Sequence, residues 1–300
     1  RNRALMTNSA WRTEQRHTIL ELWKEAVATS PDTVFLHFLD DNEKYTYAQF
    51  DALSNRLAQG LLSSGIASGD RIATLLDSHA DSVALLIAAS KVNAVYVPVN
   101  TANKGEFLRN PLANSGARVL VSEAQYLERV AAIREGLPDL QTIYIRGESS
   151  GSATAGELFA QLYSDNSADT DICPDPGDIA GIIYTGGTTG PSKGCILSQN
   201  YIANQALRTR EMCDPRPGEV NWTCLPLFHL NAIVVTLLYS VVSGTTAAIT
   251  PRFSLSGFWA DIKKSGASVA SVLGSMIPLI ANMPDSEDML RCKGQLRMAR

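Results

Sequence analysis

The sequence predicts an α/β protein whose layered, mixed but largely parallel sheets are flanked by helices. Short apolar runs of strand length alternate along the chain with segments whose apolar residues recur at helical spacing. Strands that alternate with helices imply crossover connections and a mostly parallel sheet covered on both faces. With 300 residues and 45% hydrophobic content, the chain is long enough to bury one large core or two smaller ones.

The first half of the chain is organised as strands separated by helices. Strands are predicted at 33–39, 71–77, 94–99, 117–123 and 142–146. Helices are predicted at 47–65 and 80–93. The stretch from Arg146 to Asp178 is rich in Ser, Asp, Gly and Pro, so we expect mainly a surface connection with one short helix there. This composition places the boundary between a first α/β subdomain at 1–170 and a second at 171–300.

The alternation resumes after this connection. Strands are predicted at 179–185, 194–198, 220–228, 245–250 and 266–275, with helices from about 199 to 212 and at 232–242. The apolar segment 232–242 is interpreted as an ordinary core helix, with a contribution to an acyl tunnel as the alternative. Residues 290–300 look like the start of one more strand, so we expect the second subdomain to be truncated.

Charge and cysteine content exclude several classes of function. The net charge is −4 and the basic residues are scattered, which argues against nucleic acid as a partner. No apolar run is long enough to span a bilayer, and the first residues lack the apolar run of a signal peptide. The cysteines form no C-x-x-C pair, which favours small buried thiols in a reducing, cytoplasmic compartment over disulfides or a zinc site. They are Cys173, Cys195, Cys213, Cys224 and Cys292.

The segment IIYTGGTTGPSKGC, residues 182–195, carries the strongest functional signal. A strand that runs into a glycine-rich loop at the carboxyl edge of a parallel sheet is a common place for a ligand site. Glycines let backbone N–H groups approach phosphate oxygens, threonine hydroxyls add donors, and a lysine adds a mobile positive charge. This combination suits a polyphosphate.

The two best-known phosphate-binding patterns do not fit this loop. A P-loop needs Gly directly before Lys and Ser or Thr after it, but Ser192 precedes Lys193 and Gly194 follows it. The dinucleotide pattern G-x-G-x-x-G does not match the spacing of the three loop glycines. A P-loop NTPase is therefore the weakest of the functional alternatives.

The motif YTGGTTGPSKG resembles the phosphate-loop signature of the AMP-forming acyl-adenylate superfamily, which includes acyl-CoA synthetases and the adenylation domains of peptide synthetases. The sequence has Gly186 where Ser is common, and Pro191-Ser192 where the family has x-Pro. LPLFH, which ends at His229, resembles the acyl-pocket motif of CoA ligases. The resemblance extends from about His17 to the end and is closest to carnitine/crotonobetaine-type ligases. It implies the N-terminal large domain of the acyl-adenylate-forming fold, incomplete at the C-terminus.

The resemblance also implies a function and its residues. The implied enzyme is an ATP-dependent carboxylic acid–CoA ligase that uses ATP, Mg²⁺ and coenzyme A and acts as a monomer or homodimer. Lys193 would counter charge as pyrophosphate departs, His229 would lie at the acyl pocket and gate thiol entry, and Asn231 would shape the same pocket. The β- and γ-phosphates would be wrapped by Thr185, Gly186, Gly187, Thr188, Thr189 and Gly190.

Several expectations limit this interpretation. The family's adenine-binding motif, its magnesium-coordinating Glu and its C-terminal catalytic Lys have no counterpart in the chain, so 300 residues alone are expected to be catalytically incomplete. No metal ligand is predicted within the chain, and His17, His37 and His79 are interpreted as structural. The alternatives are an adenylation domain that loads a carrier protein and a non-catalytic nucleotide-binding remnant of a ligase.

Overall fold

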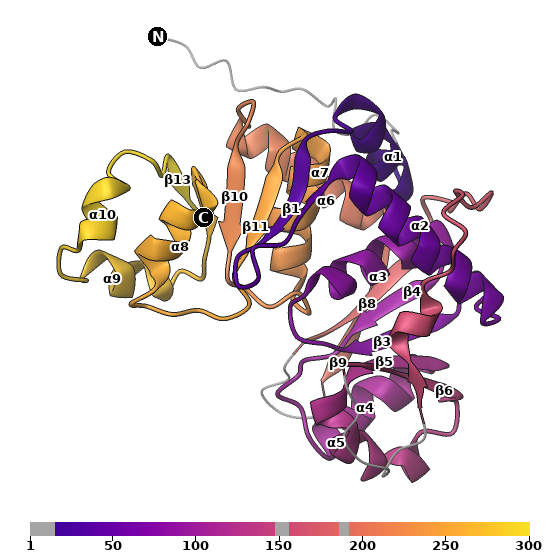
Figure 1. Cartoon of the computed structure of the whole chain (residues 1–300). Helices are drawn as coiled ribbons and strands as arrows, with labels where there is room; N and C mark the ends of the chain where they lie inside the picture. The colour runs from indigo at the N-terminus through magenta and orange to yellow at the C-terminus, as the bar shows by residue number, and fades with distance from the viewer. Residues whose placement is uncertain (1–15, 148–155, 186–191) are drawn as a thin grey trace, which may run out of the picture.

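The computed structural model describes residues 16–147, 156–185 and 192–300 (Figure 1). The strands are β1 (Val34–Phe38), β2 (Lys44–Thr46), β3 (Arg71–Leu75), β4 (Val95–Pro98), β5 (Val119–Glu123), β6 (Thr142–Arg146), β7 (Glu157–Leu158), β8 (Ile179–Thr185), β9 (Lys193–Ser198), β10 (Val220–Thr223), β11 (Thr246–Ile249), β12 (Val269–Ser271) and β13 (Met298–Ala299). Every strand expected from the sequence overlaps one of these strands, so the predicted alternation is confirmed.

Helices connect most of the strands. The α-helices are α1 (Ile19–Thr29), α2 (Tyr47–Ser63), α3 (Ala80–Lys91), α4 (Glu106–Ser115), α5 (Leu127–Ala131), α6 (Gln199–Cys213), α7 (Tyr239–Ser243), α8 (Phe258–Ser265), α9 (Met276–Ala281) and α10 (Glu287–Arg291). Short 3-10 helices are η2 (Ala124–Tyr126), η3 (Arg134–Gly136) and η4 (Phe159–Leu162), and η5 (Ala232–Leu238) is a π-helix. None of the helices in the described part of the chain has the length and hydropathy of a membrane-spanning segment.

The strands form two sheets. One has six strands in the order β13-β12-β10-β11-β1-β2, and the other has seven in the order β7-β6-β5-β3-β4-β8-β9. All neighbouring strands run parallel except β1 with β2 and β8 with β9, which are antiparallel. The predicted mixed, largely parallel sheets flanked by helices are therefore confirmed.

The sheets do not divide the chain at residue 170, where the sequence suggested the subdomain boundary. The strands β1 and β2 precede that point but belong to the six-stranded sheet with β10 and β11. Likewise β8 and β9 follow it but complete the seven-stranded sheet beside β4. The chain thus passes between the sheets more than once. Strand pairing of this kind is a long-range choice that local composition does not reveal.

The largest apolar cluster lies between the sheets and contains residues from both. Trp23 of α1, Phe35 of β1, Leu57 of α2, Leu85 of α3 and Ile183 of β8 are all buried in it. Trp23 and Phe35 pack edge to face with ring centroids 5.0 Å apart, and such aromatic pairs contribute about 0.5–1.5 kcal/mol beyond their buried area. This shared core fixes the position of one sheet against the other.

Two smaller clusters cover the outer faces of the sheets. Leu108 and Leu112 of α4 pack with Leu120 of β5 on the seven-stranded sheet. Phe258 of α8 packs on Trp222 of β10 on the six-stranded sheet, with ring centroids 5.3 Å apart. Figure 1 shows α4 and α5 on the far side of one sheet and α8 on the far side of the other. Helices and sheets therefore alternate in layers.

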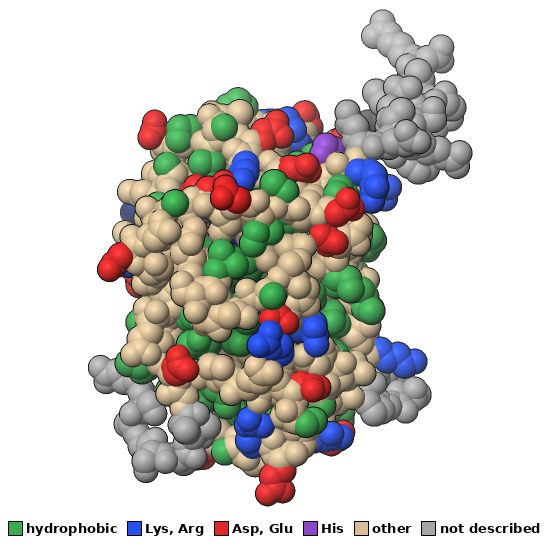
Figure 2. Space-filling view, turned by 90° about the vertical axis from the view of Figure 1, so that its right-hand side faces the viewer, with side chains coloured by type: hydrophobic (Ala, Val, Ile, Leu, Met, Phe, Trp, Pro, Cys, Tyr) green, Lys and Arg blue, Asp and Glu red, His purple; other side chains and the backbone are tan. Residues whose placement is uncertain are grey.

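The face of the molecule seen in Figure 2 carries no basic patch among the residues that the structure describes. Acidic and basic side chains are interspersed there, and hydrophobic side chains appear between them. This distribution agrees with the small net charge of −4 and gives that face no field that would attract a polyanion.

All five cysteines are free. Cys213, Cys224 and Cys292 are buried as expected, and burial raises the pKa of the Cys224 thiol to about 11. The expectation is wrong for Cys173 and Cys195, which are exposed. Cys173 lies in the irregular connection before β8, and Cys195 lies on the edge strand β9, where part of the strand has no covering layer.

A buried lysine joins three of the helices between the sheets. Lys91, at the end of α3, is 1% exposed, and its Nζ lies 2.5 Å from Oδ1 of Asp51 in α2. It also donates to Oδ1 of Asn55, while Nε1 of Trp23 in α1 donates to the same Asp51 oxygen at 2.7 Å. Burial lowers the pKa of Lys91, and the charge of Asp51 opposes that shift. The ion pair with Asp51 offsets the desolvation cost of burying the Lys91 ammonium and so keeps that group charged.

Replacing Asp51 with Ala should therefore strongly destabilise the fold. Because the substitution leaves the Lys91 ammonium buried without its counter-ion, we expect a loss of about 3 kcal/mol in the free energy of unfolding, measured by urea denaturation. Asp32→Ala, at an exposed position, is the control and should change stability by less than about 0.5 kcal/mol. The double variant Asp51→Ala/Lys91→Met should recover part of the loss, and equal stability of Asp51→Ala and Asp32→Ala would contradict this interpretation.

Candidate functional site

The carboxyl ends of the parallel strands of the two sheets meet at one place. In the seven-stranded sheet, β3 and β8 end at the same edge because both run parallel to β4. Ser78 follows β3 and Leu227 follows β10 of the other sheet, and the backbone N–H of Leu227 donates to the Ser78 hydroxyl at 3.2 Å. Such edges are where open α/β proteins normally bind ligands.

The predicted phosphate loop spans the end of the β8–β9 hairpin. Thr185 and Lys193 lie opposite each other as the last described pair of this hairpin, and both are exposed. The structure therefore brings together the two predicted site residues on either side of the loop. The other predicted loop residues lie outside the described part of the chain; they are Gly186, Gly187, Thr188, Thr189 and Gly190.

Helix α4 holds the ends of the two strands that flank the loop. Asn110 donates to the carbonyl oxygen of Ser192 at 2.8 Å, and the Tyr184 hydroxyl donates to Oδ1 of Asn114 at 2.8 Å. Gly194 is required by the same packing, since a Cβ there would lie 2.7 Å from Cγ2 of Ile182 and 3.0 Å from the Tyr184 ring. The glycine that follows Lys193 thus allows β8 and β9 to approach closely.

His229 and Asn231 lie in and after the turn that leaves β10, and both are exposed. The N–H of His229 donates to the carbonyl of Pro226 at 3.0 Å, and the carbonyl of His229 accepts from Ile233 at 3.3 Å. The Phe228 and His229 rings lie 4.7 Å apart. Although the residue as a whole is exposed, partial burial of its ring lowers the pKa of His229 from 6.5, so the imidazole is neutral at pH 7.

The segment after His229 is a helix buried in the core, as expected for 232–242, and its first part is a π-helix. The wider turn covers Ala232–Leu238 and continues into α7. The Arg300 guanidinium donates to the carbonyl of Val235 at 2.6 Å and lies over the Tyr239 ring at 4.1 Å. A segment that is apolar on every side gives no periodicity that would distinguish the two kinds of helix, and π-helices often occur at functional sites.

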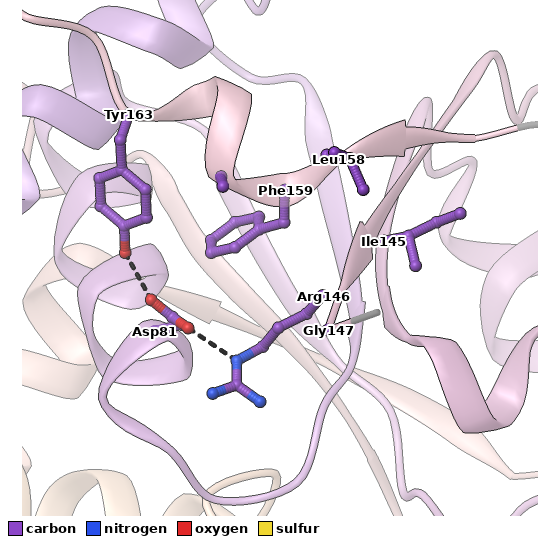
Figure 3. Close-up of a pocket in the computed structure, with 8 residues that line it drawn as sticks. Asp81, Ile145, Arg146, Gly147, Leu158, Phe159 and Tyr163 are labelled. Atoms are coloured by element: carbon purple, nitrogen blue, oxygen red, sulfur yellow. Dashed lines mark hydrogen bonds and ion pairs between the residues drawn. The ribbon is translucent and has the colours of Figure 1, made fainter. Parts of the chain in front are cut away.

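A cavity lies at the β6–β7 end of the seven-stranded sheet (Figure 3). Its volume is about 500 Å³, and its lining includes Phe159 and Leu158 on one side and Arg146 and Asp81 on another. Oδ2 of Asp81 accepts from Nε of Arg146 at 2.7 Å, and Oδ1 accepts from the Tyr163 hydroxyl at 2.7 Å. Figure 3 shows these three side chains converging from different elements.

The pKa values of the carboxylates in this network are shifted from their usual range. Burial alone would raise the pKa of Asp81, but hydrogen bonds from His79, Tyr163 and Arg146 outweigh it and hold that pKa well below its usual range. Burial raises the pKa of Glu123, which also accepts hydrogen bonds from Arg146. Asp81 is thus a fixed carboxylate at the start of α3.

Several residues near the site were not identified from the sequence. Ser78, Asn110 and Arg300 reach the site region only through tertiary contacts. Their neighbours in the sequence form no recognisable motif, so nothing local indicates their roles. Only residues within the glycine-rich loop and the LPLFH segment carried a readable signal.

The chain is similar to a known family over nearly its whole length. Residues 23–299 match the family model described as AMP-binding enzyme. The long-chain-fatty-acid–CoA ligase FadD13 of Mycobacterium tuberculosis is 28% identical over 290 residues, which cover 95% of this chain and 53% of that protein. A crotonobetaine/carnitine–CoA ligase of Salmonella paratyphi A is 28% identical over 246 residues, covering 80% of this chain and 47% of the relative.

A solved structure agrees with these relatives. The inhibitor-bound N-terminal domain of FACL13 from Mycobacterium tuberculosis has a TM-score of 0.80 and 26% identity. The match covers 91% of this chain and 68% of that one. The chain spans about half the length of the curated relatives it matches.

The substitution Ser78→Ala tests the hydrogen bond from the Leu227 N–H that joins the two sheets. Removing the acceptor should cost about 1 kcal/mol locally and speed hydrogen exchange of the Leu227 amide roughly five-fold. Ser63→Ala is a suitable control, because Ser63 lies on α2 and bonds only its own helix at Gln59. Unchanged exchange at Leu227 in Ser78→Ala would show that this bond does not hold the turn.

The lowered pKa of His229 predicts a pH effect of defined sign. Since the unfolded chain binds a proton more readily than the folded one, His229 should reduce the free energy of unfolding as the pH falls below about 6.5. An NMR titration should give a midpoint below 6.5 for the imidazole resonance that disappears in His229→Gln. As the pH falls, the free energy of unfolding should also decrease less in His229→Gln than in the parent chain. A midpoint at or above 6.5 would contradict the prediction.

Proposed function

This chain belongs to the AMP-binding enzyme family, and on that premise we propose that it forms the N-terminal part of an ATP-dependent, AMP-forming carboxylic acid–CoA ligase. The observation that carries the proposal is the hairpin pair Thr185 and Lys193, at the ends of a loop rich in glycine and threonine. Thr185 ends β8 at the edge of the sheet to which Ser78 ties the His229 turn. A polyphosphate held there would face the turn from the other sheet.

The proposed reaction has two steps. A carboxylate oxygen of the acid attacks the α-phosphorus of ATP, the bond to the β-phosphate breaks, and an acyl-adenylate and pyrophosphate form. The thiolate of coenzyme A then attacks the acyl carbon, and the bond to AMP breaks. ATP with Mg²⁺ supplies the activated phosphorus and part of the charge neutralisation.

The residues of this chain would provide positioning and charge. The first step brings an anion toward a polyanion, so electrostatic stabilisation must supply much of the rate enhancement. Lys193 is exposed at the mouth of the hairpin, where its ammonium can follow the leaving pyrophosphate. Thr185 adds a hydroxyl from the opposite strand. Asn110 and Gly194 would keep the two strands in register while the loop holds the phosphates.

His229 and Asn231 would act on the acid and the thiol. A neutral imidazole beside Phe228 adds no positive charge that would hold the carboxylate back from the phosphorus. The position of His229 in an exposed turn suits a side chain that moves to admit the thiol. Asn231, two residues later, would line the same acyl pocket.

We extend the proposal to the whole protein. Its substrates would be a carboxylic acid, ATP and coenzyme A, it would act as a monomer or homodimer in the cytoplasm, and these 300 residues alone would not complete the reaction. The names of the two curated relatives support a CoA acceptor over a carrier protein.

The proposal predicts a large effect of Lys193→Ala on pyrophosphate release. The measurement uses the gene product that carries this sequence, with ATP and a panel of carboxylic acids, with and without coenzyme A. Loss of the charge that stabilises departing pyrophosphate should lower the acid-dependent rate about 100-fold or more. Lys293→Ala, at an exposed position after α10, should leave the rate unchanged.

The same assay contains two further arms. Coenzyme A should be needed for turnover, and the 300-residue chain alone should give no acid-dependent pyrophosphate release. A rate in Lys193→Ala equal to that in Lys293→Ala would refute the role of Lys193. The absence of release with every acid would refute the ligase assignment, provided that ATP binding is intact by calorimetry.

A further inference from the structure

Three metal-ligating side chains converge on one side of the junction between the sheets. Asp41 and Glu43 lie in the turn between β1 and β2 of the six-stranded sheet, and His79 follows β3 of the other sheet. One ligand atom from each of the three side chains lies within 4.8 Å of the other two. Nε2 of His79 is 4.0 Å from Oδ2 of Asp41. Nothing in the proposed ligase chemistry uses these residues.

We propose that Asp41, Glu43 and His79 bind a divalent transition-metal cation of the Zn²⁺ type, and that this cation links the two sheets. The proposal goes beyond the proposed ligase function and does not depend on it. One imidazole nitrogen with two carboxylates is a ligand set that suits such ions, whereas Mg²⁺ and Ca²⁺ prefer oxygen ligands alone.

The orientation of the His79 ring supports a metal more strongly than the acidic residues do. Nδ1 of His79 lies 3.3 Å from Oδ2 of Asp81, whereas Nε2 lies 4.0 Å from Oδ2 of Asp41 in the cluster. When Nδ1 carries the proton and donates it to this carboxylate, Nε2 presents its lone pair toward Asp41 and Glu43. Metal-binding histidines are held by an outer carboxylate in this way.

The alternative tautomer serves the helix instead. Nδ1 is also 3.3 Å from the backbone N of Asp81, from which it can accept a hydrogen bond as the N-cap of α3. In that tautomer Nε2 carries the proton and points it at the carboxylates. Metal binding therefore selects one of two tautomers that the same ring position allows.

The outer carboxylate is itself firmly held. Asp81 accepts hydrogen bonds from Arg146 and Tyr163, which Figure 3 shows reaching it from two other elements. These contacts hold the carboxylate in place and leave its Oδ2 beside Nδ1 of His79. The support of the histidine thus extends from α3 into β6 and the segment after η4.

Neighbouring groups also orient the three ligands. The ring of Phe38 stacks on His79 with centroids 5.9 Å apart. The Tyr45 hydroxyl donates to Oε2 of Glu43 at 3.0 Å, and Oδ1 of Asp41 accepts from the N–H of Glu43 at 3.1 Å. Each carboxylate therefore keeps an oxygen that can turn toward a cation.

The three ligand atoms must draw closer together to bind one ion. In a tetrahedral site with zinc–ligand bonds of about 2.0–2.2 Å, any two ligand atoms lie roughly 3.3–3.6 Å apart, whereas the atoms here lie within 4.8 Å of one another. The Asp41 side chain is 44% exposed, so it can rotate toward the others without disturbing the core. Solvent would fill the remaining coordination position. A cation bound there would join the β1–β2 turn to the start of α3, next to Ser78.

The test is a metal titration of the untagged, chelator-treated 300-residue chain. Calorimetry with Zn²⁺ should give one site per chain, Co²⁺ should give visible absorption bands of a bound ion, and Zn²⁺ should raise the Tm. The chain has only four histidines, and the exposed thiols of Cys173 and Cys195 are replaced with Ser so that they do not bind Zn²⁺.

Matched variants identify the ligands. His79→Asn retains a side chain that caps helices well, so α3 should remain folded while the affinity for Zn²⁺ falls by more than about tenfold. Asp41→Asn should weaken binding similarly, and Asp32→Asn, at an exposed position before β1, should not. No Zn²⁺ binding by the parent chain, equal affinity in His79→Asn, or Mg²⁺ binding as tight as Zn²⁺ binding would each overturn the proposal.

Discussion

The arrangement of the site depends on the apolar core that the two sheets share. Side chains of β1 and β11 from one sheet and of β3 and β8 from the other are buried in the same cluster, together with the helices between them. Burial of this apolar surface is the dominant favourable term for such a fold. Because the core fixes the sheets against each other, the carboxyl ends of β3 and β10 face one another. The hydrogen bond from Leu227 to Ser78 follows from that placement.

The buried charged side chains Lys91, Glu123 and Glu219 are each paired with an opposite charge, since unpaired buried charges are expensive. Lys91 is held by Asp51 and Asn55 between the sheets. Glu219 lies before β10 and forms a two-point ion pair with Arg297, with contacts of 2.5 Å and 2.9 Å. The hydrogen bonds from Arg297 hold the pKa of Glu219 below its usual value against the effect of burial. These pairs connect segments distant in sequence and leave the exposed residues at the strand ends, Thr185, Lys193 and His229, available for ligands.

Local features were predictable from the sequence and distant pairings were not. The strands and the long helices follow from apolar periodicity, and both α1 and α2 begin at capping boxes, with Thr18 and Thr46 as the N-caps. The strands β8 and β9 and the loop between them were readable from contiguous segments, whereas their antiparallel pairing was not predicted. The membership of β1 in the later sheet, the position of Ser78 and the approach of Arg300 to Val235 depend on contacts between distant segments. His79 was interpreted as structural, because its meeting with Asp41 and Glu43 exists only in the folded chain.

The most direct measurement is a crystal structure of the protein with ATP and Mg²⁺ bound. The triphosphate should lie at the mouth of the β8–β9 hairpin, with its β- and γ-phosphate oxygens in reach of Lys193 and Thr185 and its α-phosphorus facing the His229 turn. A triphosphate bound elsewhere, or one that leaves Lys193 and Thr185 without contact, would contradict the proposal that this hairpin positions ATP.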